Sequence, residues 1–194
     1  HYFQIFMSFE NAFVINNAEL SPTGKPFNNA YRYVDWLLTV PLLLIELILV
    51  MNLTQSQTIS KGTTLGIAAA LMIILGYPGE VSSDLSDRIF WWSLAMIPFL
   101  YIVFVLFIGL KDSILNQPVE VRGQIKVACW VTIVSWSFYP VVYLLPNFGL
   151  TGGDAYVGLQ VGYSIADIVS KAGFGVLIYI IAYKKSKVEG YSIS

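Results

Sequence analysis

The chain contains 194 residues, of which 56% are hydrophobic, 15% aromatic and only 12% charged. Globular chains carry about 25% charged residues, so roughly half of the usual charge is absent, and the mean hydropathy is +0.67. This composition predicts an all-α integral membrane protein and excludes a disordered chain. The net charge of −1, without a basic cluster, excludes nucleic-acid binding. Cys129 is the only cysteine, so we expect a small buried hydrophobe and no disulfide.

The first residues, His1-Tyr2-Phe3, resemble the end of a helix rather than the start of a chain. Neither an initiator Met nor a signal-peptide pattern is present. We therefore expect a partial span over residues 1–9 and a single transmembrane domain over 1–194 that is N-terminally incomplete.

Five later segments are apolar over about 20 residues, the length that crosses a bilayer. They cover roughly 31–52, 62–78, 88–110, 123–145 and 155–183. Turn-forming residues are expected to separate them, at Ser21-Pro22-Thr23-Gly24, Pro78-Gly79, Gln117-Pro118, Pro146-Asn147 and Thr151-Gly152-Gly153. Three prolines inside spans are expected to kink the helices rather than end them: Pro41, Pro98 and Pro140.

The basic residues predict the orientation, because Lys and Arg accumulate on the cytoplasmic side. With alternating spans, one side receives Lys61, Lys111, Arg122, Lys126, Lys184, Lys185 and Lys187, and the other Lys25 and Arg88, with Arg32 at a helix mouth. We therefore expect a multi-pass protein of the cell membrane with a cytoplasmic C-terminus and outward-facing loops at 10–30 and 79–87.

Four charged residues lie well inside spans, namely Asp35, Glu46, Asp167 and Lys171, and Arg32 lies near the outer end of its helix. Charged side chains at membrane depth are rare and usually functional. A single one could cap a helix, snorkel, or form a pair that only holds helices together. Four with this spacing favour a functional interpretation.

Asp35 and Thr39 share a helix face because they are four residues apart. Glu46 returns to within roughly 20° of that face, about 16 Å further along the axis. This pattern predicts a row of proton-exchanging groups along the membrane normal. The apolar neighbours of Glu46 predict that its carboxyl group is buried.

Lys171 follows Asp167 by four residues on the last span. A lysine at this depth must form an ion pair, lose its proton or be chemically converted. Asp167 is one candidate partner and Asp35 a second, and Arg32 could offset the remaining negative charge. Lysine also forms Schiff bases with aldehydes. A protonated Schiff base is a cation too, and Asp167 and Asp35 could be its counterions.

Trp136, Tyr139 and Tyr143 lie on one face of another span, and together with Trp36 they could form flat walls around an elongated apolar ligand. Ordinary core packing or an interfacial aromatic belt is the alternative. The nearby Lys171 is the observation that favours a ligand pocket over these alternatives.

These motifs resemble the microbial (type 1) rhodopsins, and the resemblance covers essentially the whole chain. The run Arg32-Tyr33-Val34-Asp35-Trp36-Leu37-Leu38-Thr39-Val40-Pro41 resembles the third helix of proteorhodopsins. Asp167-x-x-x-Lys171 resembles their seventh helix, Trp136-x-x-Tyr139-Pro140-x-x-Tyr143 their sixth, and His1-Tyr2 the outer half of their second. The Tyr77-Pro78-Gly79-Glu80 and Gln160-Val161-Gly162-Tyr163 runs are most similar to the xanthorhodopsin-like branch. The implied fold is a seven-transmembrane-helix bundle, represented here from the end of the second helix to the seventh.

The resemblance implies all-trans retinal bound to Lys171 as a protonated Schiff base. It implies Asp35 as counterion and proton acceptor, Asp167 as second counterion and Arg32 as a gate on the release side. Tyr2 would bond near Asp167, and His1 would pair with Asp35. The remaining implied retinal contacts are Trp36, Leu43, Met72, Gly76, Trp92, Trp136, Tyr139, Pro140 and Tyr143.

The combination of Asp35, Thr39 and Glu46 resembles that of outward proton pumps, with Glu46 as the donor that returns the proton. The resulting hypothesis is a light-driven ion transporter rather than an enzyme. The alternatives are a photosensory rhodopsin on the same chromophore and a retinal-free transporter in which Lys171 and Asp167 form a plain ion pair.

Within the family, Leu at the position of Leu43 implies absorption of green light. Trp92 stands where carotenoid-binding xanthorhodopsins have Gly, so we expect no carotenoid antenna at that site. Glu10, Glu19 and Glu80 are equal candidates for a proton-release group. The expected surroundings are a lipid bilayer and further copies of the chain, in a trimer or pentamer, and no metal site is expected.

Overall fold

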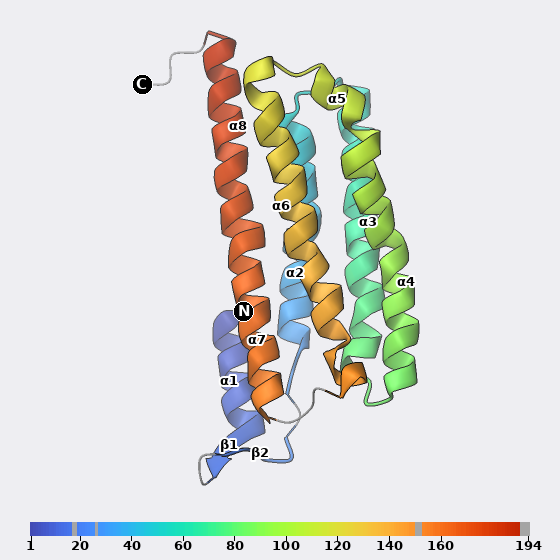
Figure 1. Ribbon diagram of the computed structural model, residues 1–194, viewed down its shortest axis with the longest axis vertical. Helices are drawn as coiled ribbons and strands as arrows, with labels where there is room; N and C mark the ends of the chain where they lie inside the picture. Colours follow the sequence, from blue (N-terminus) through green and yellow to red (C-terminus); the bar gives the residue numbers. More distant parts are fainter. Residues whose placement is uncertain (17–18, 26, 150–152, 191–194) are drawn as a thin grey trace.

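Long helices running side by side make up most of the computed structural model, which describes residues 1–16, 19–25, 27–149 and 153–190 (Figure 1). The helices that cross the bundle are α2 (Ala30–Val50), α3 (Gln55–Val81), α4 (Leu85–Phe104) and α6 (Val119–Tyr143). α4 continues through a π-helical segment, η1 (Val105–Gly109), into α5 (Lys111–Leu115). The last crossing consists of α7 (Gly153–Asp167), the π-helical η3 (Ile168–Gly173) and α8 (Phe174–Val188). A 3-10 turn, η2 (Leu145–Phe148), follows α6.

Five helical segments of the described residues are long and apolar enough to cross a membrane. The expected all-α membrane bundle is therefore confirmed. Pro41, Pro98 and Pro140 lie inside α2, α4 and α6, as expected. The prediction that Pro78-Gly79 separates two spans is wrong, because α3 continues through both residues to Val81. The helix ends three residues later, and Arg88 donates to the carbonyls of Gly79 and Glu80 in its last turn.

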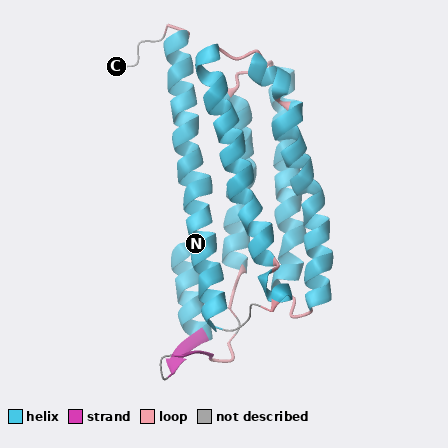
Figure 2. Ribbon diagram, viewed as in Figure 1, coloured by secondary structure: helices cyan, strands magenta, loops and turns pink. Residues whose placement is uncertain are grey.

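A short hairpin, which the sequence did not predict, follows α1 (Tyr2–Ala12). Its strands β1 (Phe13–Asn16) and β2 (Glu19–Pro22) pair antiparallel, with Phe13 opposite Pro22 and Asn16 opposite Glu19. Figure 2 shows it as the one strand pair drawn, at one end of the bundle. We call this the hairpin end, and the opposite end, where α5 and the last turn of α8 lie, the α5 end. Thr151 and Gly152 of the expected turns lie outside the described residues.

The core lies between the helices, and apolar side chains also cover much of the outer surface. One hydrophobic cluster contains residues from several helices that are 0% exposed, among them Leu44, Leu47 and Ile48 of α2, Leu65 of α3 and Ile125 of α6. Residues such as Ile97, Val134 and Ile168 are more than half exposed. An apolar exterior on a well-packed bundle is what a lipid environment requires. Cys129 is buried and free, as expected.

Candidate functional site

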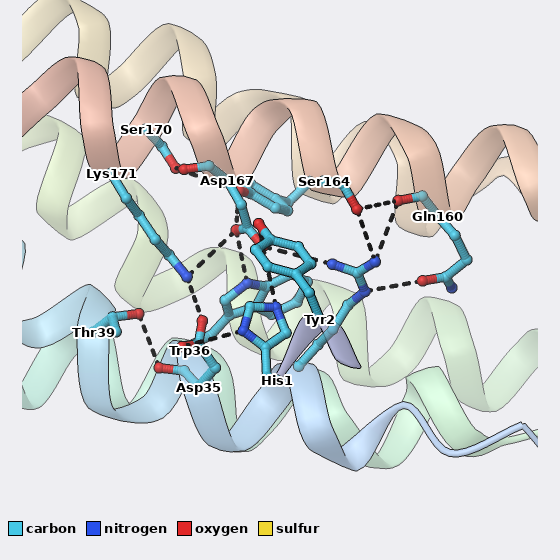
Figure 3. Close-up of polar contacts among 12 residues, drawn as sticks. His1, Tyr2, Asp35, Trp36, Thr39, Gln160, Ser164, Asp167, Ser170 and Lys171 are labelled. Atoms are coloured by element: carbon cyan, nitrogen blue, oxygen red, sulfur yellow. Dashed lines mark hydrogen bonds and ion pairs between the residues drawn. The ribbon is translucent and has the colours of Figure 1, made fainter. Parts of the chain in front are cut away.

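Lys171 lies at the centre of an ion cluster that also contains Asp35 and Asp167 (Figure 3). Its Nζ donates a hydrogen bond to Asp35 Oδ2 of α2 and lies 3.6 Å from Asp167 Oδ1. The lysine sits in η3, where the helix widens to a π-helical turn; such bulges occur frequently at functional sites. The structure thus brings together three of the four charged residues that the sequence singled out inside spans.

Asp167 is the most buried member of the cluster, with a side chain only 1% exposed. Its Oδ1 accepts hydrogen bonds from Trp36 Nε1 at 3.0 Å and Tyr139 OH at 2.7 Å, and its Oδ2 accepts one from Tyr2 OH at 3.2 Å. These three donors satisfy the buried carboxylate oxygens. The expected contact between Tyr2 and Asp167 is therefore present.

Arg32 lies on the hairpin side of the cluster, beside Asp167 rather than Asp35. Its Nη1 is 3.6 Å from Asp167 Oδ2. Its Nε donates to Gln160 Oε1 at 2.9 Å, and its Nη2 donates to Gln160 O and to Ser164 Oγ, both at 3.2 Å. These bonds fix the guanidinium, so two cations, Lys171 and Arg32, balance two carboxylates.

His1 bridges the two acids from α1. Its Nδ1 lies 3.4 Å from Asp35 Oδ1 and its Nε2 lies 3.7 Å from Asp167 Oδ2. Ligand atoms of these three residues lie within 4.8 Å of one another, as in a metal site. Lys171 and Arg32 already neutralise both carboxylates, however, and would repel a divalent cation. The arrangement favours proton exchange over metal binding.

An elongated, mostly apolar cavity begins at Lys171 and crosses the bundle to α4. Together with the open space at its mouth it encloses about 760 Å³. Its walls include the following residues proposed from the sequence: Trp36, Leu43, Met72, Gly76, Trp92, Trp136, Tyr139, Pro140 and Tyr143. Trp92 Nε1 donates to Pro140 O at 2.9 Å, and Tyr143 OH donates to Gly76 O at 3.2 Å, so both rings are held in place.

Thr39 and Glu46, the other members of the expected row of proton-exchanging groups on α2, differ from the expectation. Thr39 Oγ1 donates to the backbone carbonyl of Asp35 at 2.9 Å, so it touches the peptide rather than the carboxyl group. Glu46 is exposed, and so are Leu42 and Leu49 on the same strip. The prediction of a buried Glu46 is wrong, because no described element packs against this strip of α2. Apolar neighbours in sequence indicate a membrane helix but not which face is covered.

Several residues of the site were not singled out from the sequence. Gln160 and Ser164 hold Arg32, and Tyr163 stacks on Tyr139 with ring centroids 5.6 Å apart. Ser170 Oγ lies 3.4 Å from Tyr139 OH. Gln160, Ser164 and Asp167 recur at helical spacing, and this polar stripe on an apolar span was a signal that could have identified them.

The three candidate release groups lie in different surroundings. Glu80 is buried, 3.4 Å from Arg88 Nη2, and accepts a hydrogen bond from Asn29 Nδ2 at 3.3 Å. Arg88 also donates to Gly79 O, Glu80 O and Tyr143 O. Glu10 is exposed, and the side chain of Glu19 lies outside the described part of the structure.

Residues 1–185 match the family model described as bacteriorhodopsin-like protein. The chain is 35% identical to bacteriorhodopsin of Halobacterium salinarum over 162 residues, which is 81% of this chain and 59% of that protein. It is 31% identical to green-light absorbing proteorhodopsin of a gamma-proteobacterium over 157 residues, covering 80% of this chain and 62% of the relative.

Solved structures agree with these relationships. Xanthorhodopsin, described as a light-driven ion pump with dual chromophore, superposes with a TM-score of 0.90 at 47% identity, covering 99% of this chain and 77% of that one. Thermophilic rhodopsin superposes with a TM-score of 0.90 at 42% identity, covering 98% and 77%. The chain spans about three fifths of the length of the curated relatives. On this evidence the chain belongs to the bacteriorhodopsin-like family of microbial rhodopsins.

Proposed function

We propose that this rhodopsin is a light-driven outward proton pump. The observation that carries the proposal is Lys171 Nζ, held between the carboxylates of Asp35 and Asp167 at one end of an apolar cavity. The lysine offers a transferable proton, Asp35 a nearby acceptor, and the cavity an apolar site for a chromophore.

The cavity fits retinal by its chemistry. Its single lysine lies at one end, and the flat faces of Trp36, Trp136 and Tyr139 line its length. We propose Lys171 Nζ as the point of attachment and all-trans as the bound form. Bound retinal would supply light absorption and an isomerisation that changes the proton affinity at this nitrogen.

Asp35 is the proposed proton acceptor, because its Oδ2 is the direct hydrogen-bond partner of Lys171 Nζ. Its side chain is 22% exposed, against 1% for Asp167. Asp167, fixed by Tyr2, Trp36 and Tyr139, is the proposed second counterion that stays charged. His1, in contact with both acids, is proposed to tune Asp35.

Arg32 is the proposed gate on the release side. Its charge lies beside Asp167, and its bonds to Gln160 and Ser164 orient it toward the hairpin end. A proton on Asp35 weakens the attraction of the cluster for this cation, and a shift of Arg32 would favour release at that end.

Glu46 is the proposed donor that returns a proton to Lys171 Nζ from the other side. It lies eleven residues beyond Asp35 on α2, toward the α5 end. Proton supply and proton release are thus placed toward opposite ends of one helix. The α5 end carries Lys61, Lys111, Lys126, Lys184 and Lys187, so we propose that it faces the cytoplasm and that transport runs outward.

The experiment adds all-trans retinal to cells that express the protein, then illuminates an unbuffered suspension. The expected result is reversible acidification of the medium that a protonophore abolishes. A visible absorption band without acidification would contradict the pump and support the photosensory alternative. No visible band would support the retinal-free transporter.

Three finer properties are proposed with the same function. Leu43 lines the cavity, and we expect green absorption. Trp92, bonded to Pro140 O, closes the α4 side of the cavity, so we expect no carotenoid energy-transfer band in the excitation spectrum. A trimer or pentamer in the bilayer is the proposed assembly.

A further inference from the structure

A buried ion pair at the hairpin end, formed by Arg88 of α4 and Glu80 of α3, has no part in the function proposed above. The two side chains are 8% and 5% exposed, and Arg88 Nη2 lies 3.4 Å from Glu80 Oε2. Asn29, the residue before α2, donates from Nδ2 to the other carboxylate oxygen at 3.3 Å. Burying two charges costs free energy that is recovered only with good additional hydrogen bonds, so the other contacts of the pair indicate its use.

The guanidinium of Arg88 holds the ends of two helices. Its Nη1 donates to Gly79 O at 3.1 Å and to Glu80 O at 3.0 Å, both in the last turn of α3. Its Nη2 donates at 2.8 Å to the carbonyl of Tyr143, the last residue of α6. The last carbonyls of a helix have no partner within it, and a positive charge complements the negative end of the helix dipole. One side chain of α4 therefore ties the end of α6 to the end of α3.

Tyr143, the residue that is tied in this way, also forms part of the cavity wall. The guanidinium carbon of Arg88 lies 4.7 Å from the centroid of its ring, and its hydroxyl donates to Gly76 O at 3.2 Å. A side chain at Gly79 would overlap this hydroxyl, so glycine there lets Tyr143 pack closely against α3. Arg88 thus contacts both the backbone and the ring of a residue that lines the cavity.

The position of Tyr143 matters for the part of the cavity away from Lys171. Gly76 of α3 and Trp92 of α4 line this part together with Tyr143. Because Lys171 is the proposed point of attachment at one end, the other end of an elongated ligand would lie toward α3 and α4. In retinal, the end opposite the aldehyde is a six-membered ring.

We propose that the Arg88–Glu80 pair positions Tyr143 and thereby sets the preference of the cavity for a ligand that ends in a ring. This inference rests on the proposed function, because it takes Lys171 as the attachment point of retinal. Glu80 orients the guanidinium, and the guanidinium fixes Tyr143. Neither Arg88 nor Glu80 lines the cavity, so both are positioning residues that act through Tyr143.

The test measures how fast the visible band forms when retinal-free protein in lipid nanodiscs receives all-trans retinal or an acyclic polyene aldehyde of the same length. The ratio of the two rates measures the preference for the ring. We expect this ratio to fall about tenfold in Glu80→Gln and in Arg88→Lys. Arg88→Lys keeps the charge, but a single amine cannot reproduce the forked contacts of the guanidinium.

The ratio distinguishes positioning from a general loss of stability, which would slow both reactions equally and leave the ratio unchanged. Asp87→Asn is the matched control, because it also replaces a carboxylate by an amide, next to Arg88 in sequence. Asp87 is exposed, and its Oδ2 accepts from Ser82 Oγ at 3.3 Å. We expect the parent ratio in this variant.

A double-mutant cycle tests whether the pair acts through Tyr143. In a Tyr143→Leu background the ratio should already be low, and adding Glu80→Gln or Arg88→Lys should not lower it further, because residues that act through one another are not additive. An equal fall with and without Tyr143 would overturn the proposal, and so would an unchanged ratio in both single variants. Absence of a band with either aldehyde in the parent protein would instead overturn the proposed retinal site, and this inference with it.

Discussion

Lys171 and Lys185 lie on the same continuous helical segment, fourteen residues or roughly 21 Å apart, and their surroundings differ completely. Lys171 faces two carboxylates at the end of a cavity. Lys185 faces a backbone carbonyl and an amide oxygen. Carboxylates can take up a proton, whereas the oxygens around Lys185 cannot hold one near neutral pH. The partners therefore suit Lys171 to the proposed proton exchange and Lys185 to holding helix ends together.

The largest expected effect is the difference between the alanine variants of the two lysines. Lys171→Ala should abolish the visible absorption band after retinal is added, because the attachment nitrogen is lost. Lys185→Ala should keep the band, since it lies outside the cavity. Absorption spectra of the two purified variants test this. A visible band in Lys171→Ala, or its absence in a folded Lys185→Ala protein, would contradict the comparison.

The next effect concerns the acceptor. Asp35→Asn should reduce light-driven acidification by at least about 10²-fold, because an amide cannot accept the proton of Lys171 Nζ. The dark absorption band of the parent protein should also shift as the pH is lowered, and this shift should disappear in Asp35→Asn. Asp35→Glu, which keeps a carboxyl group, is the control. If the shift persists in Asp35→Asn, the titrating counterion is another residue.

A smaller effect is expected at the donor. Glu46→Gln should slow the return of the proton to Lys171 Nζ by about 10²-fold while leaving the first transfer to Asp35 unchanged. Flash spectroscopy resolves the two steps, and Glu46→Asp is the matched control. Glu46 lies on an exposed strip of α2, so its substitution should leave the packing unchanged. A slower proton return can then be attributed to the loss of its carboxyl group. An unaltered photocycle would remove Glu46 from the mechanism.

The smallest effect concerns Thr39, whose hydroxyl bonds to the Asp35 carbonyl and not to its carboxyl group. Thr39→Val removes one neutral hydrogen bond of about 1 kcal/mol, so the transfer from Lys171 to Asp35 should change by roughly fivefold. Thr39→Ser should retain the parent rate. A loss as large as that of Asp35→Asn would indicate that Thr39 takes part in the transfer itself.

The contrast between the two lysines also shows how far the sequence alone can lead. Lys171 was identified because Asp167 stands one turn before it, and intrahelical spacing can be read from the chain. Lys185 was counted only as one of several basic residues at a helix end. Its partners, Val50 O and Gln117, are distant in sequence and include a backbone atom, which no side-chain pattern records.

The sequence by itself determined the membrane class, the presence of five apolar spans, the charged residues within them and the family. These properties follow from composition and from local periodicity, which can be read within each helical segment separately. The tertiary structure decided that α3 runs through Pro78, that Arg32 lies against Asp167, and that Glu46 is exposed while Lys185 is buried. The physical reason is that burial and ion pairing depend on which faces of different helices pack together.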